Sequence, residues 1–260
     1  MRDRTQTVRI CVNHHHDSGR NDEVHDAVGG NRWRAQRLAG GVGHRGRVGI
    51  CVYATVQDVA HALRAAEVIG VDIPIGLSEH APRAADVQAR RFVGGRRACS
   101  IFAAPLRGML HAQSQPEASR LHRALDHDKQ RGFGVQSFGL LDKIRHWDAA
   151  LRSDAAWAVR VHEVHPEVSF AVLNGGQGLA AGKKTPAGHA QRVALLGEHV
   201  GHARVQALLA AVPRRLAAPD DVLDALVACW SAQRIAAGTA GSLPAVVEHD
   251  RHGLRMAIRY

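Results

Sequence analysis

Apolar residues change their pattern along the chain near residue 48. Up to that point the sequence has neither the alternation of a strand nor the three-and-four spacing of an amphipathic helix. Beyond it, a short apolar run at 48–53 is followed by helically spaced apolar positions at 55–66 and by a continuous apolar run at 68–75. A strand, a helix and a buried strand in this order are typical of an α/β sheet. We therefore expect an irregular stretch over 1–48, outside the fold, and one α/β domain over 49–260.

The rest of the sequence predicts mainly helices. Alternation predicts one further strand at 158–164, and a hairpin is expected near the C-terminal end, where 245–249 and 254–258 flank Asp250-Arg251-His252-Gly253. The fold class is thus α/β, a sheet flanked by helices. Helix-start residues and apolar spacing indicate helices at 84–91, 121–126, 140–150, 166–173, 188–199 and 219–237.

The chain is strongly basic, with a formal net charge of +10 and a pI near 10.4. Residues 1–50 hold nine Lys/Arg and five Asp/Glu, which gives +4 and leaves +6 for residues 51–260. A basic balance favours polyanionic partners, and nucleic acid is the partner we expect. The four cysteines are scattered, and no apolar run approaches the roughly 20 residues of a membrane span. We therefore expect reduced thiols, no membrane partner and a cytoplasmic location.

Four carboxylates stand where structure alone would not place them. Asp72 lies within the apolar run, Glu163 ends the predicted strand at 158–164, and Asp221 and Asp224 share one face at the start of the last helix. A carboxylate in an apolar strand must be paired, hydrogen-bonded or bound to a metal. Magnesium prefers oxygen ligands and often takes few carboxylates, and two such ions can hold the attacking and leaving oxygens of a phosphodiester. These acids are therefore candidate catalytic residues around Mg²⁺ or Mn²⁺.

Each of these acids also has a purely structural interpretation. Asp221 is as well placed to cap the last helix as to bind a metal. Asp72 can bond to an amide at the end of its strand, and Glu163 can pair with a surface arginine. The sequence leaves both interpretations open.

Basic residues follow these acids along the chain. Arg83 comes shortly after the run that holds Asp72, and Lys183-Lys184 lies in a glycine-rich segment after the strand of Glu163. Lysine is scarce in this arginine-biased chain, so a pair of lysines is unusual here. We expect Arg83, Lys183 and Lys184 to contact phosphate, and the alternative is an ordinary solvated surface.

Several short strings of the chain resemble a bacterial predicted-nuclease family known as domain of unknown function 429. They occur in the family's order and spacing over about residues 50–258, and the most specific is Glu-Val-His-Pro-Glu-Val-Ser-Phe at 163–170. The other positions that carry the likeness are Asp72 to Leu77, Arg83, Asp86, Ala89, Arg90, Ser100 to Pro105, Arg107, Gln136, Lys143, Ile144, Asp148, Lys183 to Thr185, Gly188, Arg192, Asp220 to Ala225, Trp230 and Ala232.

The resemblance implies an RNase H-like mixed sheet flanked by helices, related to Holliday-junction resolvase-type nucleases. In that fold the metal-binding acids come from the first strand, a later strand and the last helix. Asp72, Glu163 and Asp224 (or Asp221) are the matching candidates here, with Mg²⁺ or Mn²⁺ as the implied cofactor.

The resemblance also extends the expected contacts and the expected function. Arg107 and Lys143 join the candidate phosphate contacts. The implied activity is metal-dependent hydrolysis of phosphodiesters in nucleic acid. The alternative is a nucleic-acid or nucleotide binding protein that keeps the fold without cleavage. A sugar kinase or acyl transferase is disfavoured, because the chain has no glycine-rich phosphate loop ending in Lys-Ser/Thr.

The chain departs from the family pattern at its start. Members open with a strand that ends in Val/Ile-Asp-Gly and reaches Gly-Trp a few residues later, and the Asp of that motif is a central ligand. No such motif occurs in residues 1–50. Without that ligand the chain as written is expected to be impaired as a nuclease.

A shifted reading frame would explain the missing motif. Codons for residues 27–39, read one nucleotide later, permit Ile-Asp-Gly-x-Arg-Asn-Gly-Trp, and the codon across His25 and Asp26 permits Met. We therefore hypothesise that residues up to about 48 are translated out of frame. The genomic nucleotide sequence tests this, because a stop codon or a missing motif in the shifted frame contradicts it.

Overall fold

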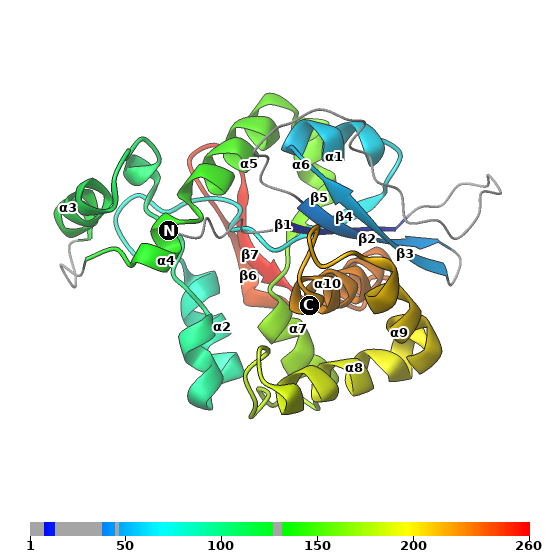
Figure 1. Cartoon of the computed structure of the whole chain (residues 1–260). Helices are drawn as coiled ribbons and strands as arrows, with labels where there is room; N and C mark the ends of the chain where they lie inside the picture. The colour runs from blue at the N-terminus through cyan, green and yellow to red at the C-terminus, as the bar shows by residue number, and fades with distance from the viewer. Residues whose placement is uncertain (1–7, 14–37, 45–46, 127–131) are drawn as a thin grey trace.

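The computed structural model describes residues 8–13, 38–44, 47–126 and 132–260, with side chains from Val48 onward. In this part of the chain a five-stranded sheet of order β3-β2-β1-β4-β5 lies between two layers of helices, and a two-stranded hairpin stands beside it (Figure 1). The mixed α/β class predicted from the sequence is confirmed. The strands are β1 (Val8–Asn13), β2 (Leu38–His44), β3 (Arg47–Tyr53), β4 (Val68–Val71), β5 (Val161–Glu163), β6 (Ser242–His249) and β7 (Arg255–Arg259).

The sheet contains both parallel and antiparallel pairs. β1 runs parallel to β2 and antiparallel to β4, β2 runs antiparallel to β3, and β4 runs parallel to β5. All four residues of β4 are buried, which confirms the apolar run as a buried strand. It ends at Val71 rather than at residue 75, since its pairing with β5 stops where Val71 faces Glu163, and Pro74 has no N–H for a ladder bond.

Two segments of the stretch 1–48 lie within the sheet. β1 and β2 occupy its middle, between β3 and β4, so for these segments the expectation of an irregular stretch outside the fold is corrected. Ladder bonds use only backbone groups, and the Val-Arg-Ile-Cys-Val sequence of β1 has high β propensity. Residues 14–37, on which the shifted-frame hypothesis mainly depends, lie outside the described residues, and a domain boundary at 48/49 stays a prediction.

Helices cover both faces of the sheet (Figure 1). One face carries α1, α5 and α6, the other carries α7 to α10, and α2 to α4 extend the fold away from the sheet. Two 3₁₀ helices lie at Gly95–Ser100 and Arg107–Met109. The helices are α1 (Val56–Ala62), α2 (Ala84–Val93), α3 (Gln115–Leu125), α4 (Val135–Phe138), α5 (Leu141–Ser153), α6 (Ala155–Arg160), α7 (Pro166–Leu173), α8 (Pro186–Val200), α9 (His202–Ala211) and α10 (Pro219–Ala236).

Side chains of β4 alternate between the two helical layers. Ile69 and Val71 join the core cluster under α1, α5 and α6, whereas Val68 joins the cluster under α8, α9 and α10. Gly70 faces the second layer, because a Cβ there would lie 3.2 Å from the carbonyl oxygen of Ala228 in α10. The glycine therefore lets α10 pack closely against the central part of the sheet.

Helix capping explains why α1 forms where it was expected and why the strand expected at 158–164 is shorter. Thr55 caps α1, since its hydroxyl accepts from the N–H of Asp58, and the helix lies within the range 55–66 expected from the apolar spacing. The strand expected at 158–164 begins only at Val161. Asp154 accepts from the N–H of Trp157 and starts α6, and Trp157 stacks on Trp147 with ring centroids 5.3 Å apart. Capping and aromatic packing therefore outweigh the alternating pattern there.

The remaining sequence expectations concern membranes and cysteines. Among the helices of the described ranges, none is both long and apolar enough to cross a bilayer. Cys51 and Cys99 are not in disulfide bonds, whereas Cys229 is disulfide-bonded, so the expectation of reduced cysteines is wrong at that position.

Candidate functional site

A glycine-rich loop presents two lysines at the start of α8. Thr185 caps the helix, since its hydroxyl accepts from the N–H of Gly188 at 3.1 Å, and Pro186 occupies the first helical position. Gly188 has no room for a side chain, because a Cβ there would lie 2.1 Å from the carbonyl oxygen of Gly182. The tight contact fixes the loop against α8.

The start of α10 lies next to this loop. Lys183 Nζ is 3.0 Å from Asp224 Oδ2 and 3.5 Å from Asp220 Oδ2. The Asp224 side chain is only 2% exposed, whereas the Lys183 side chain is 27% exposed. Asp221 faces its own helix start, where its carboxylate accepts from the N–H of Ala218 at 3.2 Å. The structure thus joins two groups that lie about forty residues apart, and it gives Asp221 the capping role.

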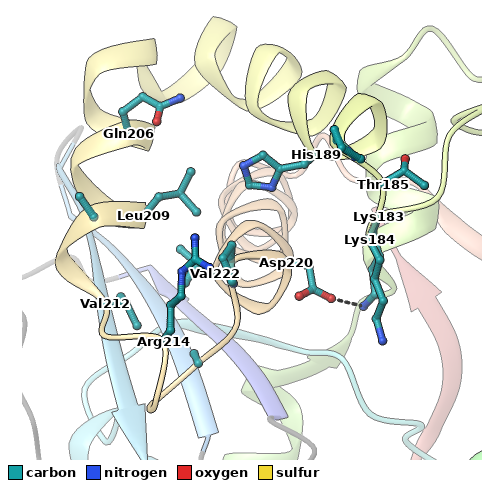
Figure 2. Close-up of a pocket in the computed structure, with 14 residues that line it drawn as sticks. Lys183, Lys184, Thr185, His189, Gln206, Leu209, Val212, Arg214, Asp220 and Val222 are labelled. Atoms are coloured by element: carbon teal, nitrogen blue, oxygen red, sulfur yellow. Dashed lines mark ion pairs between the residues drawn. The ribbon is translucent and has the colours of Figure 1, made fainter.

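A cavity of about 780 Å³ opens between this loop, α9 and the start of α10 (Figure 2). Three cationic side chains line it, Lys183, Lys184 and Arg214, against one carboxylate, Asp220. The dashed line in Figure 2 marks the ion pair between Lys183 and Asp220. With neutral histidine the lining therefore carries a net positive charge of two, which favours an anionic ligand.

Other side chains give this cavity an apolar wall and neutral polar groups. Leu209 and Val212 come from the end of α9 and the turn after it, and Val222 comes from α10 (Figure 2). His189 of α8 and Gln206 of α9 add groups that donate and accept hydrogen bonds. The combination of an apolar wall and a few polar groups is typical of small-ligand sites.

Glu163 belongs to a separate, buried group. The guanidinium of Arg83 donates to both oxygens of Glu163, at 2.8 and 2.9 Å, and also to Asp86. The N–H of Ile75 donates to Glu163 at 2.8 Å. Burial raises the pKa of Glu163, and the charge of Arg83 opposes that rise. Both Glu163 and Arg83 are almost inaccessible to solvent, so the expected phosphate contact at Arg83 does not fit the structure.

Two further buried groups also contain arginine. Arg107 donates to Asp148 at 2.9 Å and to Asp250. Glu167 accepts from Arg192 at 2.7 Å and from Arg97 at 2.9 Å. Most of these residues carry the family likeness, so much of the likeness reflects ion pairs that hold the fold together.

Two of the expected phosphate contacts are therefore not surface groups. Arg107 is 5% exposed, and its guanidinium is engaged by Asp148 and Asp250. Lys143 on α5 is 4% exposed. Burial of both cations corrects the expectation that they contact phosphate, since a phosphate would have to enter the core to reach them.

Asp72 starts a loop that these buried groups hold in place. Arg83 donates to the carbonyl oxygens of Ile75 and Gly76, at 2.9 and 3.2 Å. Asp250 accepts from the N–H of Leu77 at 3.1 Å. Asp72 itself is half-buried, directly after β4. These hydrogen bonds thus hold the loop that follows β4 in one position.

The structure therefore brings together only some of the predicted site residues. Lys183, Lys184 and Asp224 lie at one site, whereas Glu163 is paired with Arg83. Within the described ranges, no three His, Cys, Asp or Glu side chains gather closely enough to hold a metal. Three lining residues, Arg214, His189 and Gln206, could not be predicted from the sequence, because nothing in their spacing indicates that α8, α9 and α10 surround a cavity.

Comparison with known proteins identifies a family. The family model described as "Protein of unknown function (DUF429)" matches residues 26–249. The match starts inside the stretch 1–48 and includes the loop of Lys183, the start of α10 and the three buried ion-pair groups except for Asp250, which lies just beyond its end. No curated protein and no solved structure matches the chain.

Proposed function

The chain belongs to the DUF429 family, and from that premise we propose that it is a metal-dependent hydrolase of nucleic-acid phosphodiesters. The observation that carries the proposal is the meeting of Lys183 with Asp220 and Asp224 at the rim of a cationic cavity. Acidic side chains beside phosphate-binding cations are the groups that phosphodiester hydrolysis requires. The net positive charge of the chain agrees with a polyanionic substrate.

A pair of carboxylates in this site fits a magnesium ion. Asp220 and Asp224 converge on one point, which is taken by the Lys183 ammonium at 3.5 and 3.0 Å. Magnesium is often bound by one or two carboxylates together with water and substrate phosphates. Lys183 has a flexible stem and is partly exposed, so it can move away from the carboxylates. Asp220 and Asp224 would hold the ion, which when bound stabilises negative charge on phosphate.

The fold gives this proposal further support. The five-stranded mixed sheet with helices on both faces agrees with the RNase H-like fold that the resemblance implies. Alternation along β4 puts Gly70 on the face of α10, and Asp72 follows the end of this strand directly. Asp72 stays a candidate acid of the proposed hydrolase on the strength of the resemblance, although it does not form a group of three with Asp220 and Asp224 among the described residues.

The remaining roles fall to groups of this chain. Lys184 and Arg214 are exposed at the cavity and would neutralise and orient the phosphate. Lys183 would hold Asp220 and Asp224 in place until substrate binds. Arg83 and Glu163 would act as positioning residues, because they fix the loop that follows Asp72.

A cleavage panel tests the proposal. Labelled single-stranded, duplex, hybrid and junction substrates are incubated with Mg²⁺ or Mn²⁺ and with the Asp224→Asn and Asp72→Asn variants. Asp142→Asn is the matched control, since Asp142 is a half-exposed acid on α5, outside the site. We expect metal-dependent cleavage that both site variants lose and the control keeps. Cleavage unaffected by both site variants would remove the site assignment.

A second function is favoured by the position of Lys183. Its ammonium already offsets part of the charge of the two carboxylates, and the chain as written lacks the Val/Ile-Asp-Gly motif. Both observations agree with a protein that binds nucleic acid or nucleotides without cleavage. A chain whose first strand is restored by the shifted frame separates the two functions, because binding without any cleavage in that chain supports the second.

A further inference from the structure

The cavity beside Lys183 has two chemically different sides. Lys184 and Arg214 are exposed cations at its rim, whereas Leu209, Val212 and Val222 form a wall without charge (Figure 2). A volume of about 780 Å³ lies in the range of small-ligand sites, roughly 300–1,000 Å³. A ligand that matches this lining has an anionic end and a flat or apolar body of modest size.

We propose that this cavity receives one unpaired nucleotide of a nucleic-acid strand, and this inference rests on the proposed function. The phosphate lies between Lys184 and Arg214, and the base lies against Leu209 and Val222. His189 supplies a hydrogen-bonding group for the edge of the base.

The apolar wall of the cavity is the feature that would select an unpaired nucleotide. A base inside a duplex is stacked and paired, so it reaches a pocket only when it is already single-stranded or is extruded from the helix. Phosphate contacts alone would accept duplex and single strand alike. The apolar wall of Leu209, Val212 and Val222 therefore favours single strands over duplexes, since only an unstacked base can pack against it.

Charge at the rim directs the phosphate to one side of the cavity. Lys183 is engaged by Asp220 and Asp224, so its charge is largely balanced. Lys184 and Arg214 form no ion pair with these acids among the contacts described, and both are exposed. Of the two, Arg214 can also present a guanidinium plane to a base.

Two matched pairs of variants test the inference. Ala210 lines the cavity and Ala207 does not, although both are exposed on α9, so Ala210→Met narrows the cavity and Ala207→Met is its control. Arg214 lines the cavity and its exposed neighbour Arg215 does not, so Arg214→Ala is compared with Arg215→Ala. The probes are a labelled single-stranded oligonucleotide and a blunt hairpin of the same composition. Binding is measured by fluorescence anisotropy in EDTA, which separates binding from cleavage.

The expected result is a preference that depends on the cavity. The single strand binds about tenfold or more tightly than the hairpin, and Ala210→Met and Arg214→Ala each weaken that binding about fivefold or more. Ala207→Met and Arg215→Ala stay within about twofold of the unchanged protein. Equal affinity for both probes, with Ala210→Met unchanged, overturns this inference and leaves the proposed function standing. Failure to bind either probe overturns both.

Discussion

Lys183, in the loop before α8, places its Nζ 3.0 Å from the Oδ2 atom of the buried Asp224. Asp224 is almost inaccessible, and a buried carboxylate needs a partner, because its charge is poorly solvated. Asp220 approaches the same ammonium at 3.5 Å. The point at which two carboxylates converge is thus taken by a cation that belongs to the protein, and a divalent ion would have to compete with it.

This competition predicts that removing the Lys183 charge tightens metal binding. Two unit charges about 4 Å apart interact by roughly 1 kcal/mol in water and by roughly 4 kcal/mol at intermediate dielectric. We therefore expect Lys183→Met to bind Mn²⁺ about tenfold more tightly than the unchanged protein, measured by isothermal titration calorimetry. Lys184→Met is the control, because it removes the neighbouring charge. If both variants bind Mn²⁺ with equal affinity, the Asp220 and Asp224 pair is not the metal site.

The pair of Arg83 and Glu163 predicts a large effect on stability. Both side chains are buried, and Glu163→Gln leaves the guanidinium of Arg83 with Asp86 as its one charged partner among the described residues. Breaking a buried ion pair from one side typically costs about 3–5 kcal/mol. We expect a loss of this size in the free energy of unfolding, measured by urea denaturation.

A surface pair provides the comparison for this prediction. Arg145 and Asp142 form an ion pair on α5, with side chains 36% and 48% exposed. Exposed pairs of this kind contribute about 1 kcal/mol or less. Asp142→Asn should therefore cost little, and a similar small cost for Glu163→Gln would contradict the structural role of the buried pair.

Local signals in the sequence account for the elements that were predicted well. Pro166 at the first helical position and the apolar residues after it predict α7 at 166–173, and the structure gives the same bounds. Thr55 and Asp58 are three residues apart, so the capping box of α1 is visible in the sequence. Signals of this kind involve residues within one helical turn, which a sequence pattern records directly.

Long-range partners could not be predicted in the same way. Glu163 accepts from Arg83, which lies 80 residues earlier, and no periodicity indicates that pairing. The sequence offered Glu163 two interpretations, a metal ligand and a partner of a surface arginine, and the structure pairs it with a buried arginine. The cavity could not be predicted for the same reason, since Arg214 and His189 line it together only because α9 and the turn after it pack beside α8.

The environment of His162 leads us to expect that the protein loses stability in mild acid. Burial and the charges of Arg255 and Arg259 lower the pKa of His162 to about 3, and its Nδ1 has no hydrogen-bond partner in the part of the molecule described. In the unfolded chain a histidine titrates near 6.5. Between these two pH values the unfolded state binds the extra proton, so stability rises with pH through the window and falls on acidification.

The histidine variant isolates this effect from the other titrating groups. His162→Gln has no proton to gain, so its free energy of unfolding should fall less steeply than that of the unchanged protein between about pH 6.5 and 4. Arg255 and Arg259 are present in both proteins, so their contribution cancels in the comparison. The measurement is urea denaturation at several pH values, and parallel pH profiles would show that His162 is not responsible.

Gly188 links the loop of the candidate site to stability. A Cβ at this position would lie 2.1 Å from the carbonyl oxygen of Gly182, so Gly188→Ala must displace the loop that carries Lys183 and Lys184. We expect the variant to lose nucleic-acid affinity by about tenfold and to unfold at lower urea, because the loop and the start of α8 shift together. Gly182→Ala is the matched control, since the nearest atom to a Cβ there is 3.5 Å away, an ordinary contact. Nucleic-acid affinity is measured by fluorescence anisotropy, and stability by urea denaturation, for both variants. If Gly188→Ala binds as well as Gly182→Ala, the position of the two lysines does not control binding.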